Sequence, residues 1–129
     1  MSKGMNDKTS IKTVKLIKQI GTDMDWKAKD KGQLLNALLA CKNRDEMARF
    51  LRDLMTKQEI EEFAKRLQAA RMLSEDTQYN AIIEKTGLSS TTVARIAKWL
   101  NGSLGGYRII LNRLSNHHHL SPKLGKGLS

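Results

Sequence analysis

Four hydroxyl residues stand side by side at positions 89–92, inside the segment "GLSSTTVARIAKWLN". Short hydroxyl side chains donate and accept hydrogen bonds, and one at the start of a helix can cap it through its oxygen. Two cations, Arg95 and Lys98, follow within the same segment. Hydrogen-bonding groups and positive charge together suit contact with phosphates and base edges. The hydroxyl residues are Ser89, Ser90, Thr91 and Thr92.

The spacing of this segment predicts a helix from residue 89 to residue 100 with two different faces. Its apolar residues recur at intervals of three and four, so they gather on one side that can pack into the protein. Thr91, Arg95 and Lys98 fall on the opposite side, which is therefore cationic and hydroxylated. The apolar residues of the inward side are Val93, Ile96, Ala97 and Leu100.

A second short helix is predicted directly before this one, over residues 77–85, and Gly87 separates the two. Two short helices joined by a tight glycine turn form a helix-turn-helix, whose second helix can lie in the major groove of DNA. The same arrangement also occurs in proteins that never meet DNA, and Ser or Thr at a helix start is ordinary capping. The motif favours a DNA-facing surface only when it is combined with the charge.

The charge of the chain is concentrated at its two ends. The 129 residues carry a net charge of +10, and residues 32–76 contribute nothing because 8 basic residues balance 8 acidic ones. Residues 1–31 hold 8 basic and 4 acidic residues, and residues 77–129 hold 7 basic residues against Glu84 alone. A neutral middle between basic ends predicts a structural core that carries a polyanion-facing part, although ribosomal or membrane-surface partners would also fit.

The bulk composition, with 40% hydrophobic and 28% charged residues, describes one soluble globular domain. No apolar run approaches the roughly 18 residues of a membrane span, and the N-terminus lacks signal-peptide character. We therefore expect a cytoplasmic protein without a membrane partner. The single cysteine, Cys41, cannot form an internal disulfide, and a buried inert thiol is expected there.

Helical spacing continues through the rest of the chain. Helices are expected over residues 33–74, and the last of them should begin at a capping box formed by Thr56 and Glu59. This leucine-rich region has more apolar face than three helices of one chain can cover, so we expect these to be dimerisation helices. A final helix is predicted over residues 106–115, with Ile109, Ile110 and Leu114 facing inward. No segment alternates like a strand, so the fold class is all-α with about six helices. The organisation is a basic, partly ordered extension over 1–31, a helical domain over 32–115 that includes the helix-turn-helix at 77–100, and a flexible tail over 116–129.

The run that begins "LMTKQEIEEFAKRLQAARMLSEDTQYNAII" and ends "LNGSLGGYRIIL" resembles the Trp repressor family, over about residues 33–115. It is most similar to the branch of that family with an "LN.G.GGY" segment behind the recognition helix. The resemblance implies an intertwined homodimer of six-helix chains, each presenting one helix-turn-helix. It also implies a sequence-specific regulator of transcription that binds double-stranded DNA and acts as a repressor.

The resemblance assigns roles to particular residues. Ser90, Thr91 and Ala94 correspond to the DNA-reading positions, where members of the family often contact bases through water. Tyr79 and Asn80 align near positions that hold the phosphate backbone of the DNA.

In the tryptophan-responsive members, the indole of the ligand lies between two arginines that correspond here to Arg66 and Arg95, with Thr56 lining the same pocket. Two neighbours differ. Ile96 stands where those members have glycine, and Trp99 stands where they have serine. Overpacking a formed site costs about 1–3 kcal/mol, so the resemblance implies an altered pocket; alternatively, both residues simply complete the core. We expect that free tryptophan is not the corepressor and that no cofactor is required, while any other small-molecule effector remains open.

Other chemistry receives little support. Three adjacent histidines in a tail, residues 117–119, cannot all face one ion, so no metal site is expected. The segment "NGSLGGY" has no lysine at P-loop spacing, and no catalytic pairing of residue types stands out, so no enzyme is expected. The alternative function is a homodimeric interaction protein whose basic face binds RNA or an acidic protein. The low aromatic content, 5%, argues against readers that stack single-stranded bases.

Overall fold

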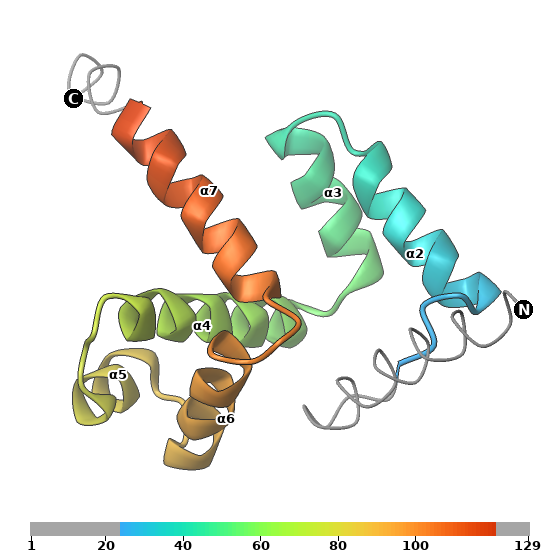
Figure 1. Ribbon diagram of the computed structural model, residues 1–129. Coiled ribbons are helices and arrows are strands. Elements are labelled where there is room, and N and C mark those ends of the chain that lie inside the picture. Colours follow the sequence, from blue (N-terminus) through green and yellow to red (C-terminus); the bar gives the residue numbers. More distant parts are fainter. Residues whose placement is uncertain (1–23, 121–129) are drawn as a thin grey trace, which may run out of the picture. The chain divides into compact units, whose positions relative to one another are not determined.

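A computed structural model describes the backbone of residues 24–120 and the side chains of residues 24–116 (Figure 1). This part of the chain holds six helices and no strand, which confirms the predicted all-α class. Most of the predicted N-terminal extension, residues 1–23, lies outside the described residues. The helices are α2 (Lys29–Ala40), α3 (Arg44–Leu54), α4 (Lys57–Ser74), α5 (Tyr79–Thr86), α6 (Ser90–Leu100) and α7 (Gly106–Leu120). The chain divides into two compact units, up to Lys65 and from Arg66 onward, and each is described by itself.

In the first unit, side-chain caps set the starts of α3 and α4. Asn43 caps α3 by accepting a hydrogen bond from the backbone N–H of Glu46 at 2.9 Å. The predicted capping box of α4 is confirmed: the N–H of Thr56 donates to Glu59 Oε1 at 2.8 Å, and the N–H of Glu59 donates to Thr56 Oγ1 at 3.1 Å. The Thr56 N–H stabilises the Glu59 carboxylate and so lowers the pKa of that group.

The first unit buries none of its described residues, although it is rich in leucine. Leu39 is 83% exposed and Phe63 is 50% exposed, and five other large apolar residues are 37–49% exposed. The helices therefore form locally, through caps and backbone hydrogen bonds, while their apolar faces stay uncovered within one chain. The other exposed apolar residues of this unit are Met24, Trp26, Leu34, Leu35 and Leu54.

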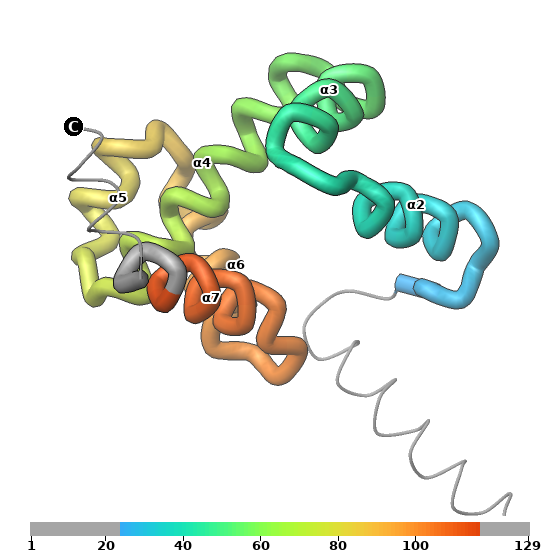
Figure 2. Tube along the Cα trace, turned by 90° about the horizontal axis from the view of Figure 1, so that it is seen from above, coloured from blue at the N-terminus to red at the C-terminus, as the bar shows by residue number. Residues whose placement is uncertain are grey.

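The second unit holds the buried core of the described chain, built where α5 and α6 meet the end of α4. α4 contributes two alanines, Ala69 and Ala70, whose small side chains allow the neighbouring helices to approach closely. Figure 2 follows α4, α5, α6 and α7 along the trace from a second direction. The remaining core residues are Ile82, Leu88, Val93 and Ile96.

Several predicted details of the fold are wrong. Ile109, Ile110 and Leu114 do not face inward but are about half exposed, because α7 presents Tyr107 and Leu111, one helical turn apart, to the core. α7 also continues to Leu120, past its predicted end at 115, since the sequence offers no helix breaker before the proline at 122. α2 begins at Lys29, inside the predicted extension, where Asp30 in the first turn favours a helix start.

Candidate nucleic-acid interface

The turn between α5 and α6 is built from one glycine and one buried hydroxyl. Gly87 takes the left-handed conformation, with φ of 76°, and its N–H donates to Ile83 O at 2.8 Å. A residue with a side chain would be strained there, so glycine suits the end of α5. Thr86 is buried; its Oγ1 donates to Ile82 O at 2.7 Å and accepts from the N–H of Leu88 at 3.2 Å. These bonds fix the direction in which the chain enters α6.

At the first turn of α6, two of the four predicted hydroxyls hydrogen-bond to each other. Ser89 caps the helix, because its Oγ accepts a hydrogen bond from the N–H of Thr92 at 3.1 Å. The same Oγ donates to Thr92 Oγ1 at 2.9 Å. Ser90 and Thr91 stay exposed at the helix start. The hydroxyls therefore divide into a pair that holds the helix end and a pair that faces outward.

The two faces of α6 agree with the sequence pattern. Ala94, Arg95 and Lys98 are exposed, in line with Thr91. The opposite side is buried, so the core holds the helix and leaves its cationic and hydroxylated side open. The structure thus brings the predicted α6 residues onto one accessible surface. The buried residues are Val93, Ile96, Ala97 and Leu100, the four that the spacing predicted.

Tyr79 and Asn80, the two predicted backbone-contacting residues, form the first turn of α5. Both are exposed, and Tyr79 is 45% exposed. α5 and α6 contact one another. The predicted residues of α5 and α6 therefore lie on the open sides of two adjacent helices that the core holds together.

The residues of the predicted ligand pocket have different environments. Ile96 is 0% exposed and belongs to the core cluster, as in the alternative interpretation that it completes the core. Arg95 is exposed, whereas Trp99 and Arg66 are partly buried. Burial raises the pKa of the Tyr107 phenol, and the positive charge of nearby Arg66 partly offsets that rise. Thr56, in the other unit, serves the capping box of α4.

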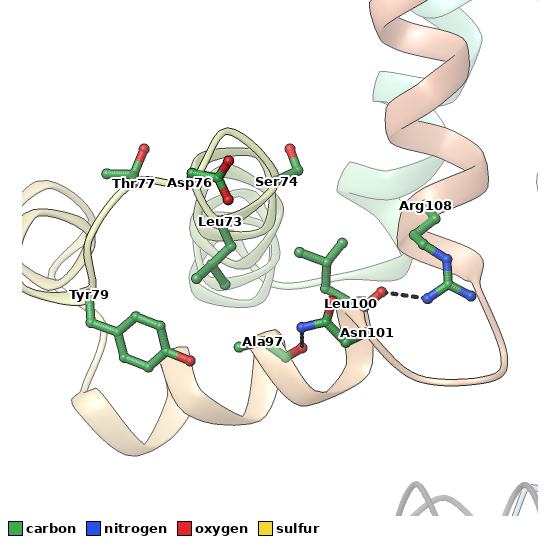
Figure 3. Close-up of a pocket in the computed structure, with 9 residues that line it drawn as sticks. All are labelled: Leu73, Ser74, Asp76, Thr77, Tyr79, Ala97, Leu100, Asn101 and Arg108. Atoms are coloured by element: carbon green, nitrogen blue, oxygen red, sulfur yellow. Dashed lines mark hydrogen bonds between the residues drawn. The ribbon is translucent and has the colours of Figure 1, made fainter.

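A different hollow, of about 490 Å³, lies beside the C-terminal half of α6 (Figure 3). None of the five predicted pocket residues lines it. Leu73, Ala97 and Leu100 supply its apolar surface, and polar groups surround them. The remaining lining residues are Ser74, Asp76, Thr77, Tyr79, Asn101 and Arg108.

Two polar contacts close the C-terminal end of α6, and sequence reasoning missed both. The side-chain amide of Asn101 donates to Ala97 O at 3.0 Å. Arg108, from the first turn of α7, donates from Nη1 to Leu100 O at 2.7 Å. Only the basic character of Arg108 is visible in the sequence, because its contact depends on how the loop after α6 folds back.

The described residues contain no group of three His, Cys, Asp or Glu side chains that could hold a metal ion. The three histidines at 117–119 belong to the last turns of α7, where only the backbone is described. Across residues 24–120, no helix combines the length and apolar character that a membrane crossing would require.

The described fold is that of an all-α protein with a helix-turn-helix, and comparison with known proteins defines its family. Residues 29–115 match the family described as Trp repressor protein, and the chain belongs to that family. It is 39% identical over 88 residues to the uncharacterised protein YerC of Bacillus subtilis (strain 168), covering 68% of this chain and 85% of that one. It also matches the crystal structure of a TrpR-like protein from Eubacterium eligens ATCC 27750, with a TM-score of 0.66 and 37% identity. That match covers 70% of this chain and 93% of the other.

Proposed function

We propose that this protein is a sequence-specific regulator of transcription that binds double-stranded DNA through α6 and acts as a repressor in the cytoplasm. The observation that carries the proposal is the division of α6 into a buried side and an open side with Thr91, Arg95 and Lys98. A helix held in this way can enter the major groove with its first turn toward the bases. The role is binding, not catalysis.

Different parts of this surface are suited to different contacts with DNA, because some carry positive charge and others carry short polar side chains. Arg95 and Lys98 supply positive charge for phosphates, which gives affinity for any duplex. Ser90, Thr91 and Ala94 lie at the open start of α6, where short side chains can contact base edges directly or through water. Tyr79 and Asn80, at the open start of α5, are proposed to hold the DNA backbone. Ser89 and Thr92 support these contacts by capping α6.

We propose that a second copy of this chain covers the exposed apolar faces. Leu39, Phe63 and Ile109 are each at least 50% exposed, on three different helices. An open apolar surface on several elements is unfavourable in water unless another molecule covers it. A symmetric dimer would cover these faces and present two copies of α6 to a near-palindromic site, with half-sites roughly 34 Å apart. Light scattering at micromolar concentration should show a dimer, and a folded monomer would contradict this.

Free tryptophan is proposed not to control the protein. Ile96 fills a core position with no exposed surface, next to Arg95. A ligand that entered beside it would have to displace packed side chains, at a cost of about 1–3 kcal/mol. Titration calorimetry with tryptophan, with and without a bound duplex, should show no specific heat. Saturable micromolar binding would restore tryptophan control.

The test of the proposed function is a selection of binding sites. The purified protein is mixed with random double-stranded oligonucleotides, bound molecules are amplified, and the enriched sequence is tested by gel shift. We expect a near-palindromic sequence bound far more tightly as a duplex than as either single strand. Equal binding to every duplex, or preference for RNA or for an acidic protein, would instead support the alternative of a basic interaction protein.

A further inference from the structure

One side chain of α7 holds the end of the recognition helix α6. Arg108 donates from Nη1 to Leu100 O at 2.7 Å, across eight residues of chain, as the dashed line in Figure 3 shows. Leu100 is the last residue of α6, so its carbonyl has no partner within the helix. A guanidinium at this position both satisfies the carbonyl and complements the negative end of the helix dipole.

The loop between the helices is shaped around this arginine. Gly105 is buried and left-handed, with φ of 74°, and a Cβ added to it would lie 3.2 Å from Arg108 Nη2. The left-handed backbone therefore favours glycine, and a Cβ would also press against the guanidinium, which would have to shift by a few tenths of an ångström. A side chain at position 105 would shift the guanidinium without removing its positive charge from the protein.

α7 also has an apolar surface that the described chain leaves uncovered. Ile109, Ile110 and Leu114 are 46–50% exposed, whereas Tyr107 and Leu111 pack against the core. In the proposed dimer, the partner copy covers the exposed side of α7. The Arg108 bond would then join the helix at the dimer contact to the helix that reads DNA.

We propose that Arg108 is a positioning residue for DNA recognition, which transmits the position of α7 to α6 and so fixes the spacing of the two half-sites. The inference rests on the proposed dimeric DNA binding. The core keeps α6 folded through Val93, Ile96 and Leu100 even without the bond. Loss of the bond leaves α6 formed but less strictly oriented, so the dimer accepts half-sites at more than one separation.

The experiment compares spacing preference among variants of the full chain. The duplex selected with the wild-type protein is remade with one or two base pairs added or removed between its half-sites, and affinity for each is measured. Arg108→Ala removes the bond and the charge, and Gly105→Ala displaces the guanidinium but keeps the charge. Arg113→Ala, an exposed arginine further along α7, is the matched control for lost charge.

We expect the preference of the wild-type protein for its own spacing to fall roughly tenfold in Arg108→Ala and Gly105→Ala, the order of one charge-assisted hydrogen bond. Arg113→Ala should keep the wild-type preference. Circular dichroism and light scattering should show that all three variants are folded and have the assembly state of the wild-type protein.

Three results would overturn the inference while the proposed function stands. Both variants could keep the wild-type spacing preference. Arg108→Ala could weaken binding equally at all spacings and lower the salt slope by about one, with Gly105→Ala unchanged, which would make Arg108 a phosphate contact. Both variants could fail to fold, which would make the bond a stability contact only. If the wild-type protein prefers no duplex at all, the proposed function fails and the inference fails with it.

Discussion

The buried hydroxyl of Thr86 should stabilise the fold more than the methyl group that valine would place at the same position. Its Oγ1 accepts the N–H of Leu88 at 3.2 Å and donates to Ile82 O at 2.7 Å, and the residue is only 5% exposed. Thr86→Val keeps the volume but leaves the Leu88 N–H buried without this acceptor. An unsatisfied buried donor costs about 1–3 kcal/mol. The free energy of unfolding should fall by that amount, although valine is the more hydrophobic residue.

The measurement is urea denaturation followed by circular dichroism, at one fixed protein concentration because association shifts apparent stability. Thr86→Ser is the matched control: it keeps the hydroxyl and loses one methyl group, at a cost of roughly 1 kcal/mol. We expect both variants to be less stable than the wild-type protein. The valine variant should be the less stable of the two, because an unsatisfied donor can cost up to about 3 kcal/mol. A valine variant as stable as the wild type would refute the reasoning, and would mean that Gly87 alone fixes the turn.

Three other predictions concern single side chains. Asp76 is left-handed, with φ of 62°, so Asp76→Gly should raise the free energy of unfolding by about 0.5–1 kcal/mol in thermal denaturation. The pKa of Glu59 is lowered, so its capping contribution is present above its ordinary pKa of 4.5 and is lost as the pH falls through the lower folded value. Glu59→Gln should therefore lose less stability on acidification, in denaturation curves recorded over that range. Arg95→Ala and Lys98→Ala should each reduce the salt slope of duplex binding by about one, whereas Thr91→Ala should change base preference at one position by roughly 1–3 kcal/mol. Unchanged binding in all three would contradict the proposed role of α6.

The sequence was sufficient to predict the parts of the fold that local physics decides. The burial pattern of α6 follows from helical spacing, and the capping box of Thr56 and Glu59 follows from residue types three positions apart. The capping box needs only neighbours within one turn of the chain, so residue types predict it. For α6 the period of the helix predicts which side can be buried, although the residues that cover that side come from α4 and α5.

Features that depend on distant parts of the chain could not be predicted. The apolar spacing of α7 shows that Ile109, Ile110 and Leu114 prefer cover, but it does not say whether the same chain supplies it. The bond from Arg108 to Leu100 needs the loop after α6 to turn back at Gly105, and loop conformation is not encoded in a periodic pattern. The predicted end of the last helix at 115 is wrong because the polar residues that follow it do not themselves stop a helix.

In the proposed function, the mutual cap of Ser89 and Thr92 separates stability from DNA selectivity at the start of α6, and this affects how the protein can evolve. Ser90, Thr91 and Ala94 are exposed, and substitutions at such surface positions usually change stability by less than about 0.5 kcal/mol. A lineage could therefore exchange these three residues, and with them the preferred operator, without losing the folded protein. Duplicated copies of the gene could diverge toward different targets by few steps, while the two capping residues stay under selection for folding alone.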